Sequence, residues 1–227
     1  MKQPTTRLNK HLALVLGLSR READDLIAQG RVTVNGMPAI LGTSVTKNDV
    51  VAVNDKQVTA QPAYQYVALH KPVGYVCSRR AQGDNPTVYD LLPSEMATLK
   101  PVGRLDKDSS GLILLTNDGD FAHQMTHPSF RKVKIYEATL NHALEPLHQQ
   151  MISDYGVEIG DGVSKLGLEK QDDTRLKWIV TMSEGRNRQI RRTFTALGYE
   201  VTGLHRTTFG QFSLGDLATG ATQFVKP

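Results

Sequence analysis

Cysteine is nearly absent from this chain of 227 residues, and so are long apolar runs. Its single cysteine, Cys77, has no second cysteine with which to form an internal disulfide, which indicates a reducing compartment. No apolar run approaches the ~18 residues of a membrane-spanning helix. We find no internal repeat and no low-complexity tract, so repeat arrays and disordered chains are excluded. With 39% hydrophobic and 22% charged residues, the sequence predicts a globular, cytoplasmic protein.

The basic charge of the chain lies mostly in its N-terminal part. Lys and Arg number 27 against 23 Asp and Glu, and the first 60 residues hold eight of the former and five of the latter. Three of the four net positive charges therefore fall there. Basic side chains in and beside two expected helices would bind nucleic-acid phosphates, although a solvated helix face explains the same charge. They are Arg7, Lys10, Arg20, Arg21 and Arg31.

Local patterns predict a small domain over residues 1–60. Apolar positions at helical spacing indicate a first helix between Arg7 and Leu16. Ser19 and Glu22 form the pattern of a capping box and predict the start of a second helix. The pair Asn35-Gly36 then favours a tight hairpin, because both residue types tolerate positive φ. We expect two helices followed by a small sheet.

Residues 61–227 predict a larger domain of mixed α+β class. Expected strands outnumber expected helices and do not alternate with them, which favours a central mixed, mainly antiparallel sheet over a doubly wound one. The domain boundary is placed in the polar stretch 54–63. Strands are expected over 66–69, 112–116, 134–140, 178–182, around 201 and over 209–214, and helices over 120–126, 144–152 and 188–197.

The most informative segment is acidic and covers residues 102–119, Val-Gly-Arg-Leu-Asp-Lys-Asp-Ser-Ser-Gly-Leu-Ile-Leu-Leu-Thr-Asn-Asp-Gly. It imitates a calcium loop from Asp106 onward, but position twelve is Asn117 where a bidentate Glu is required. It also lacks the glycines and the Lys-Ser/Thr ending of a phosphate loop. What remains is a carboxylate, Asp106, in a turn after Arg104. For an isolated Asp, a purely turn-forming role would be the alternative.

This segment resembles the catalytic motif of the ribosomal RNA pseudouridine synthases, Gly-Arg-Leu-Asp-x-x-Ser-x-Gly-Leu-x-x-Leu-Thr-Asn-Asp-Gly. The resemblance implies that Asp106 is the essential catalytic residue. The N-terminal segments Arg-Leu-Asn-Lys-His-Leu, Gly-Leu-Ser-Arg-Arg-Glu-Ala-Asp-Asp-Leu-Ile and Gly-Arg-Val-Thr-Val-Asn-Gly resemble the S4 RNA-binding domain. A DNA-binding helix-turn-helix is the competing interpretation, but a hairpin directly after the second helix fits it poorly.

Four other segments resemble parts of the same family, namely 70–75, 134–136, 183–192 and 204–206. The resemblance implies that Tyr136 stacks on the target base. It also implies that Arg191 lies beside Asp106, where it would keep the carboxylate charged and oriented. Contacts to RNA are expected from Arg104, Arg186, Arg188, Arg192 and Arg206. The form Gly-Arg-Asn-Arg-Gln is more similar to members of the family that act on large-subunit RNA, so the resemblance favours that substrate.

Isomerising uridine to pseudouridine needs no redox change and no group donor, so we expect no organic cofactor and no metal. An ionised Asp, with an ordinary pKa of about 3.9, can attack C1′ or C6 or remove a proton at C2′, and these routes stay open. The expected partners are ribosomal RNA and pre-ribosomal particles, and nothing requires more than a monomer. The alternatives are an enzyme that modifies transfer RNA and a ribosome-assembly factor without turnover.

Overall fold

Two units of structure share the chain. The structure, a computed structural model, describes residues 4–58, 62–79 and 82–227. Contacts between Cα atoms divide the chain into Met1–Gln65 and Tyr66–Pro227. The boundary expected between residues 60 and 61 lies outside the described residues and stays a prediction. None of the helices in the described ranges combines the length and the apolar character needed to span a lipid bilayer.

The N-terminal unit is built on two short helices, α1 (Leu8–Val15) and α2 (Arg20–Ala28). The Ser19 hydroxyl accepts a hydrogen bond from the Glu22 N–H at 3.1 Å, and the Glu22 carboxylate accepts one from the Ser19 N–H at 2.6 Å. The predicted capping box is therefore confirmed. The buried face of the helices and the adjoining strands form one small core of Leu8, Leu12, Ala23, Ile27, Val32, Ala39, Val45 and Val51.

Short strands complete this unit. Asn35 and Gly36 both have positive φ, 53° and 79°, and connect β2 (Val32–Val34) to β3 (Met37–Pro38) as the predicted tight hairpin. Asn54 and Asp55 also have positive φ, so the sheet continues for one more strand after residue 53. The sheet order is β3 (Met37–Pro38), β2 (Val32–Val34), β5 (Val51–Val53) and β6 (Lys56–Gln57), and β1 (Thr6–Arg7) pairs separately with β4 (Ser44–Val45).

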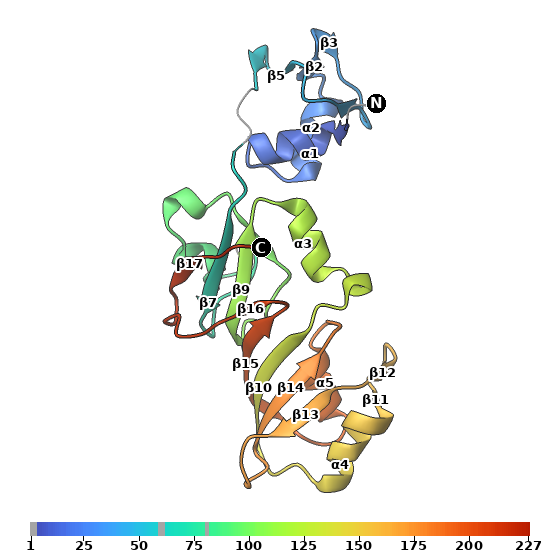
Figure 1. The fold of residues 1–227 in the computed structure, drawn as a ribbon, viewed down its shortest axis with the longest axis vertical. Helices are drawn as coiled ribbons and strands as arrows, with labels where there is room; N and C mark the ends of the chain where they lie inside the picture. The colour runs from blue at the N-terminus through green and yellow to red at the C-terminus, as the bar shows by residue number, and fades with distance from the viewer. Residues whose placement is uncertain (1–3, 59–61, 80–81) are drawn as a thin grey trace. The chain divides into compact units, whose positions relative to one another are not determined.

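A nine-stranded sheet is the centre of the C-terminal unit as far as that unit is described (Figure 1). Its order is β13-β14-β10-β15-β9-β7-β17, with β16 paired to β15 and β8 paired to β9. Only β15 and β9 run parallel among these described pairs, so the predicted α+β class with a mixed, mainly antiparallel sheet is confirmed. The strands are β7 (Tyr66–Lys71), β8 (Lys100–Val102), β9 (Ser110–Thr116), β10 (Lys134–Leu140), β13 (Gly167–Lys170), β14 (Lys177–Met182), β15 (Val201–Phe209), β16 (Phe212–Ser213) and β17 (Thr222–Phe224).

The helices of this unit are short. They are α3 (Gly119–Thr126), α4 (Pro146–Gln150) and α5 (Gln189–Thr195), with 3-10 turns at Val88–Leu91, Ser94–Met96 and Pro128–Phe130. The helix expected over 144–152 begins only at Pro146, whose fixed φ suits the first helical turn, and widens into a π-helical turn at Met151–Tyr155. A small hairpin of β11 (Val157–Glu158) and β12 (Val163–Ser164) follows it, which the sequence did not predict.

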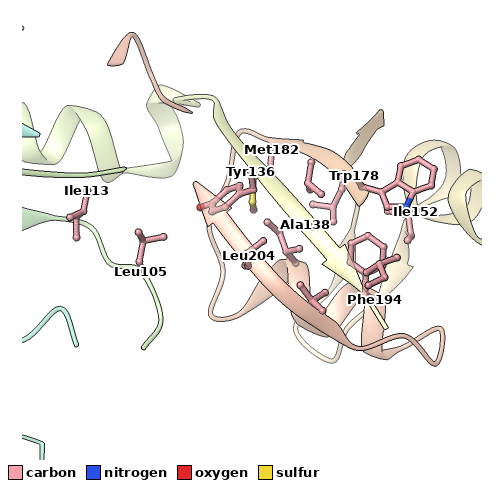
Figure 2. Packing of buried hydrophobic residues seen from close by; sticks show 14 of the residues in the cluster. Leu105, Ile113, Tyr136, Ala138, Ile152, Trp178, Met182, Phe194 and Leu204 are labelled. Carbon is pink, nitrogen blue, oxygen red and sulfur yellow. The ribbon is translucent and has the colours of Figure 1, made fainter. Parts of the chain in front are cut away.

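Alternation along the strands sets the core. Every second residue of β14 is buried, namely Trp178, Val180 and Met182. Strand β10 buries Tyr136 and Ala138 against them. Figure 2 shows Trp178 near one end of the buried cluster, Tyr136 beside Met182 farther along it, and Leu105 and Ile113 beyond Tyr136. The packed strands therefore hold Tyr136 in one position at the edge of the core.

One glycine permits the pairing of β9 with β15 in the middle of the sheet. Gly111 of β9 pairs with Arg206 of β15 and has a φ of 107°. A Cβ atom at Gly111 would lie 2.2 Å from the Arg206 carbonyl oxygen and 2.5 Å from its nitrogen, which is closer than such atoms can approach. The two backbones can therefore pair only because position 111 has no side chain.

We expect Gly111→Ala to lower the free energy of unfolding by about 3 kcal/mol or more. The added Cβ would clash with the backbone of Arg206, and alanine is also strained at this positive φ. The measurement is urea unfolding followed by the fluorescence of Trp178, the chain's one tryptophan. Gly74→Ala is the matched control, since Gly74 has a φ of 96° but open space around its Cβ position, and should cost about 1–2 kcal/mol. Equal losses in the two variants would contradict this account of Gly111.

Candidate active site

Residues far apart in the sequence surround one pocket of about 280 Å³ in the C-terminal unit. Its walls come from residues 102–106 and 109, from β10 and β15, and from the loop 185–191 that leads into α5. Seven of the expected site residues line it, namely Arg104, Asp106, Tyr136, Arg186, Arg188, Arg191 and Arg206. The volume suits one small planar group rather than a large ligand.

Hydrogen bonds from the segment 70–75 hold the loop that carries Asp106. Lys71 is fully buried, and its Nζ donates hydrogen bonds to the carbonyl oxygens of Ser109 at 2.6 Å and Pro72 at 3.0 Å. The Gly74 N–H donates to the Lys107 carbonyl at 2.7 Å. Burial lowers the pKa of Lys71, while Cys77, Asp106 and Asp108 act in the opposite direction.

The Asp106 carboxylate lies in the pocket with a cationic neighbour. Its side chain is 31% exposed, and its Oδ2 lies 3.4 Å from Nη1 of Arg188. The sequence predicted Arg191 in this position, and the ion pair is formed by Arg188 instead. Arg188 precedes α5 in the left-handed region, with a φ of 47°, and this backbone conformation allows its side chain to reach the acidic loop.

Arg191 and Arg188 both contact Asp108. Arg188 donates to the two carboxylate oxygens of Asp108 at 3.0 Å each. Arg191 donates from Nη2 to the Asp108 carbonyl at 2.9 Å, and its Nε lies 3.3 Å from Asp108 Oδ2. The hydrogen bond from Arg188, followed by the nearby charge of Arg191, lowers the pKa of Asp108 against the opposing effect of burial. Two guanidinium groups therefore fasten the acidic loop to the start of α5.

Tyr136 and Arg206 form the inner part of the pocket. They are direct cross-strand partners on β10 and β15, and Arg206 Nη1 donates to the Tyr136 hydroxyl at 3.4 Å. Arg206 is only 2% exposed, and its Nε donates to the Leu112 carbonyl at 2.8 Å. This burial differs from the exposed position expected for a contact to phosphate.

Arg186 and Arg192 hold the β11–β12 hairpin. Arg186 donates to Asp161 Oδ1 at 3.2 Å and to the Val163 carbonyl at 2.8 Å. Arg192 donates to both carboxylate oxygens of Asp161, at 3.0 and 2.5 Å, and lowers its pKa. Both guanidinium groups thus already bind protein oxygens, and their expected contacts to RNA stay predictions.

The other expected RNA contacts lie nearer the surface. Arg104 is exposed at the rim of the pocket. In the N-terminal unit Arg20 and Arg21 are exposed, and Lys10 is partly buried. Arg7 donates to the Gly42 carbonyl at 2.5 Å and Arg31 donates to Asn54 Oδ1 at 2.9 Å, with both side chains on the surface.

Sequence reasoning missed four side chains that build the site, Lys71, Asp108, Lys134 and Asp161. Lys71 lies in the segment 70–75, and its position on β7, two residues beyond the buried Leu69, is the signal that it is buried. The sequence offered Asp108 a place in a calcium loop or a turn-forming role, and neither predicts its contacts with two arginines. Asp161 belongs to a hairpin that no pattern predicted, so no sequence signal identified its two arginine partners.

The arrangement brings a carboxylate to a small pocket that is lined by both polar and apolar side chains. Leu105, Met182 and Leu204 line the pocket beside Asp106 and keep bulk water from much of its surface. Charges interact more strongly in such surroundings than in water. The pocket can therefore bind a flat aromatic group against Tyr136 and place a carboxylate near it.

Known proteins resemble the chain over almost its whole length. A family model described as RNA pseudouridylate synthase matches residues 65–196, and a model described as S4 domain matches residues 6–51. The chain is 39% identical over 219 residues to the ribosomal small subunit pseudouridine synthase A of Pasteurella multocida, covering 94% of this chain and 93% of the relative. It is 35% identical over 228 residues to the ribosomal large subunit pseudouridine synthase B of Bacillus subtilis, covering 97% and 92%.

A solved structure shares the fold. The crystal structure of a pseudouridylate synthase matches with a TM-score of 0.69 and 34% sequence identity, covering 97% of this chain and 96% of that one.

Asp108 and Asp161, whose pKa values are lowered by arginine partners, give a prediction for titration. In Arg188→Gln we expect the pKa of Asp108 to rise toward its ordinary value, because the hydrogen bond from Arg188 is the largest cause of its lowering. Stability from this pair is present above the ordinary pKa of Asp and is lost as the pH falls through the folded-state pKa. Carboxyl ¹³C NMR titration measures the pKa of each aspartate.

The matched control is Arg192→Gln, which should raise the pKa of Asp161 and leave that of Asp108 unchanged. A rise at both aspartates in either variant would show that the two arginine clusters are not independent.

Proposed function

The chain belongs to the RNA pseudouridylate synthase family, isomerases that act on RNA, and carries an S4 domain; from this premise we propose that it converts a uridine of ribosomal RNA to pseudouridine with Asp106 as the catalytic carboxylate. The observation that carries the proposal is the position of Asp106 in a pocket with Tyr136, at ion-pair distance from a guanidinium group.

The reaction breaks the N1–C1′ bond, turns the uracil and joins C5 to C1′. Asp106 can bond to C1′ or C6 or take the C2′ proton, and its neighbour Arg188 keeps an opposite charge beside it. The uridine must leave the RNA stack to reach this pocket, at a cost of a few kcal/mol. Stacking on Tyr136 returns about 1–3 kcal/mol. Arg191 supports the acidic loop through Asp108 rather than through a direct ion pair with Asp106.

RNA binding in this proposal uses both units. Arg7, Lys10, Arg20, Arg21 and Arg31 of the S4 domain contact phosphates and give affinity without reading sequence. Arg104 and Arg188 lie at the pocket and bind the backbone next to the extruded nucleotide. Arg186 and Arg192 contribute by fixing the loop on which Arg188 lies. The protein acts in the cytoplasm, as a monomer, on ribosomal RNA or pre-ribosomal particles.

The subunit that carries the target stays a separate question. One relative above is named for the small ribosomal subunit and another for the large subunit, so their names favour neither. The form Gly-Arg-Asn-Arg-Gln at residues 185–189 is the feature that favours large-subunit RNA.

We expect Asp106→Asn to bind RNA with the affinity of the wild type and to form no pseudouridine, because the amide can neither form the covalent bond nor accept the proton. Tritium release from ribosomal RNA labelled at C5 of uridine measures the reaction. Asp173→Asn is the control, since Asp173 is an exposed carboxylate paired with Lys170 outside the pocket. Substantial release by Asp106→Asn would refute the role of this residue.

Deletion of the gene should remove one pseudouridine from large-subunit ribosomal RNA and leave transfer RNA unchanged. Mapping of pseudouridines in both RNA classes, with the plasmid-borne wild type and Asp106→Asn for complementation, measures this. Loss from small-subunit RNA would correct the subunit, and loss from transfer RNA alone would correct the substrate class. Complementation by Asp106→Asn would instead indicate a non-catalytic assembly factor.

A further inference from the structure

Arg206 is a buried cation whose hydrogen bonds are incomplete. Its side chain is 2% exposed and lines the pocket, yet no acceptor among the described residues reaches Nη2. None of the ion pairs in the described part of the chain includes Arg206. A buried guanidinium without a carboxylate partner is unfavourable unless another group compensates its charge.

A second cation lies beside the first. Lys134 lines the same pocket, with its Nζ 5.4 Å from the centre of the Phe209 ring, and the guanidinium carbon of Arg206 lies 4.8 Å from the same centre. The Nζ of Lys134 donates to the Glu184 carbonyl at 3.0 Å and forms no ion pair with the described residues. Burial, and then the charge of Arg206, lowers the pKa of Lys134.

Both cations flank Tyr136. Arg206 is its cross-strand partner and Lys134 is two residues away on the same strand, which places both side chains on one face of the sheet. Among the described residues, the Tyr136 hydroxyl receives only the long 3.4 Å hydrogen bond from Arg206. The surroundings of the stacking ring are therefore positively charged and hold a donor with no acceptor.

We propose that Nη2 of Arg206 donates a hydrogen bond to a carbonyl oxygen of the uracil in this pocket, and that Arg206 and Lys134 stabilise the negative charge that the base acquires during the reaction. The inference rests on the proposed function and assigns Arg206 a contact with the base in place of a contact with phosphate. The exposed Arg104 at the rim is better placed for phosphate.

The electron count supports this assignment on every route. When N1–C1′ breaks, its electron pair stays on the uracil and spreads over N1, O2 and O4, while C1′ bonds to the Asp106 carboxylate or a C2′ proton passes to it. If Asp106 adds to C6 first, the electron pair of the C5–C6 double bond moves toward C5 and O4. On the C6 route N1–C1′ then breaks as C5 bonds to C1′, and the Asp106–C6 bond breaks to release the carboxylate. On the other routes, bond formation from C5 to C1′ releases Asp106 from C1′, or the proton held by Asp106 returns to C2′. Loss of the C5 proton and gain of a proton at N1 complete the isomerisation. Buried donors directed at developing charge act most strongly.

The test compares uridine with 5-fluorouridine at the target position of the RNA. Fluorine withdraws electrons and stabilises the base anion, so a variant that lacks a charge-stabilising donor should lose less with the fluorinated base. We expect Arg206→Gln to slow single-turnover loss of uridine by about 100-fold or more. The loss with 5-fluorouridine should be at least about tenfold smaller. Nuclease digestion and chromatography of the nucleosides measure both rates against wild type.

The control is Arg175→Gln. Arg175 also donates from Nε to a backbone carbonyl, that of Leu144, and lies over the Trp178 ring, but it does not line the pocket. This variant should change both rates equally or not at all. Lys134→Gln, which leaves the Arg206 bond to Leu112 in place, is the second pocket variant and should show the same selective loss if Arg206→Gln does not fold.

Equal losses on the two substrates in the folded pocket variants, or no loss, would overturn the inference while wild-type activity keeps the proposed function. A wild type that consumes neither nucleoside would overturn the proposed function and the inference together.

Discussion

One buried ammonium group supports the acidic loop on which the site depends. Lys71 lies with no solvent exposure and binds the carbonyl of Ser109, at the end of the loop that begins after β8. Burial lowers the pKa of Lys71, and Cys77, Asp106 and Asp108 act on it in the opposite direction without outweighing burial. The same loop is fastened from its other side by Arg188 and Arg191. The catalytic carboxylate of our proposal thus lies in a loop that hydrogen bonds from Lys71, Arg188 and Arg191 hold in place.

The sequence predicted the class of fold and the segments that meet in the pocket, because these depend on local motifs and on alternation within strands. Asp106 and Tyr136 could be identified from motifs alone, and both line the pocket. The partner of Asp106 could not, because the left-handed conformation of Arg188 is not encoded in a residue type that favours it. A helical periodicity that counts from residue 188 gives no information on which guanidinium reaches the loop.

The number of arginines in a segment also says little about where each guanidinium points. Arg186 and Arg192 lie in the most basic motif, yet both bind Asp161 of a hairpin that is distant in sequence. Arg206 lies on strand β15 and is buried beside Tyr136. Charge could be counted from the sequence, but its division between scaffold and surface depends on contacts that only the fold creates.

The place of β15 in the sheet links the site to the order in which the chain is made. In the strand order, β15 lies between β10, which carries Tyr136, and β9, which begins where the acidic loop ends. It comes from residues 201–209, later in the chain than both of these strands. Strands β9 and β10 are therefore synthesised before the strand that lies between them. The part of the pocket that these strands line cannot assemble until β15 has been made and has paired with both.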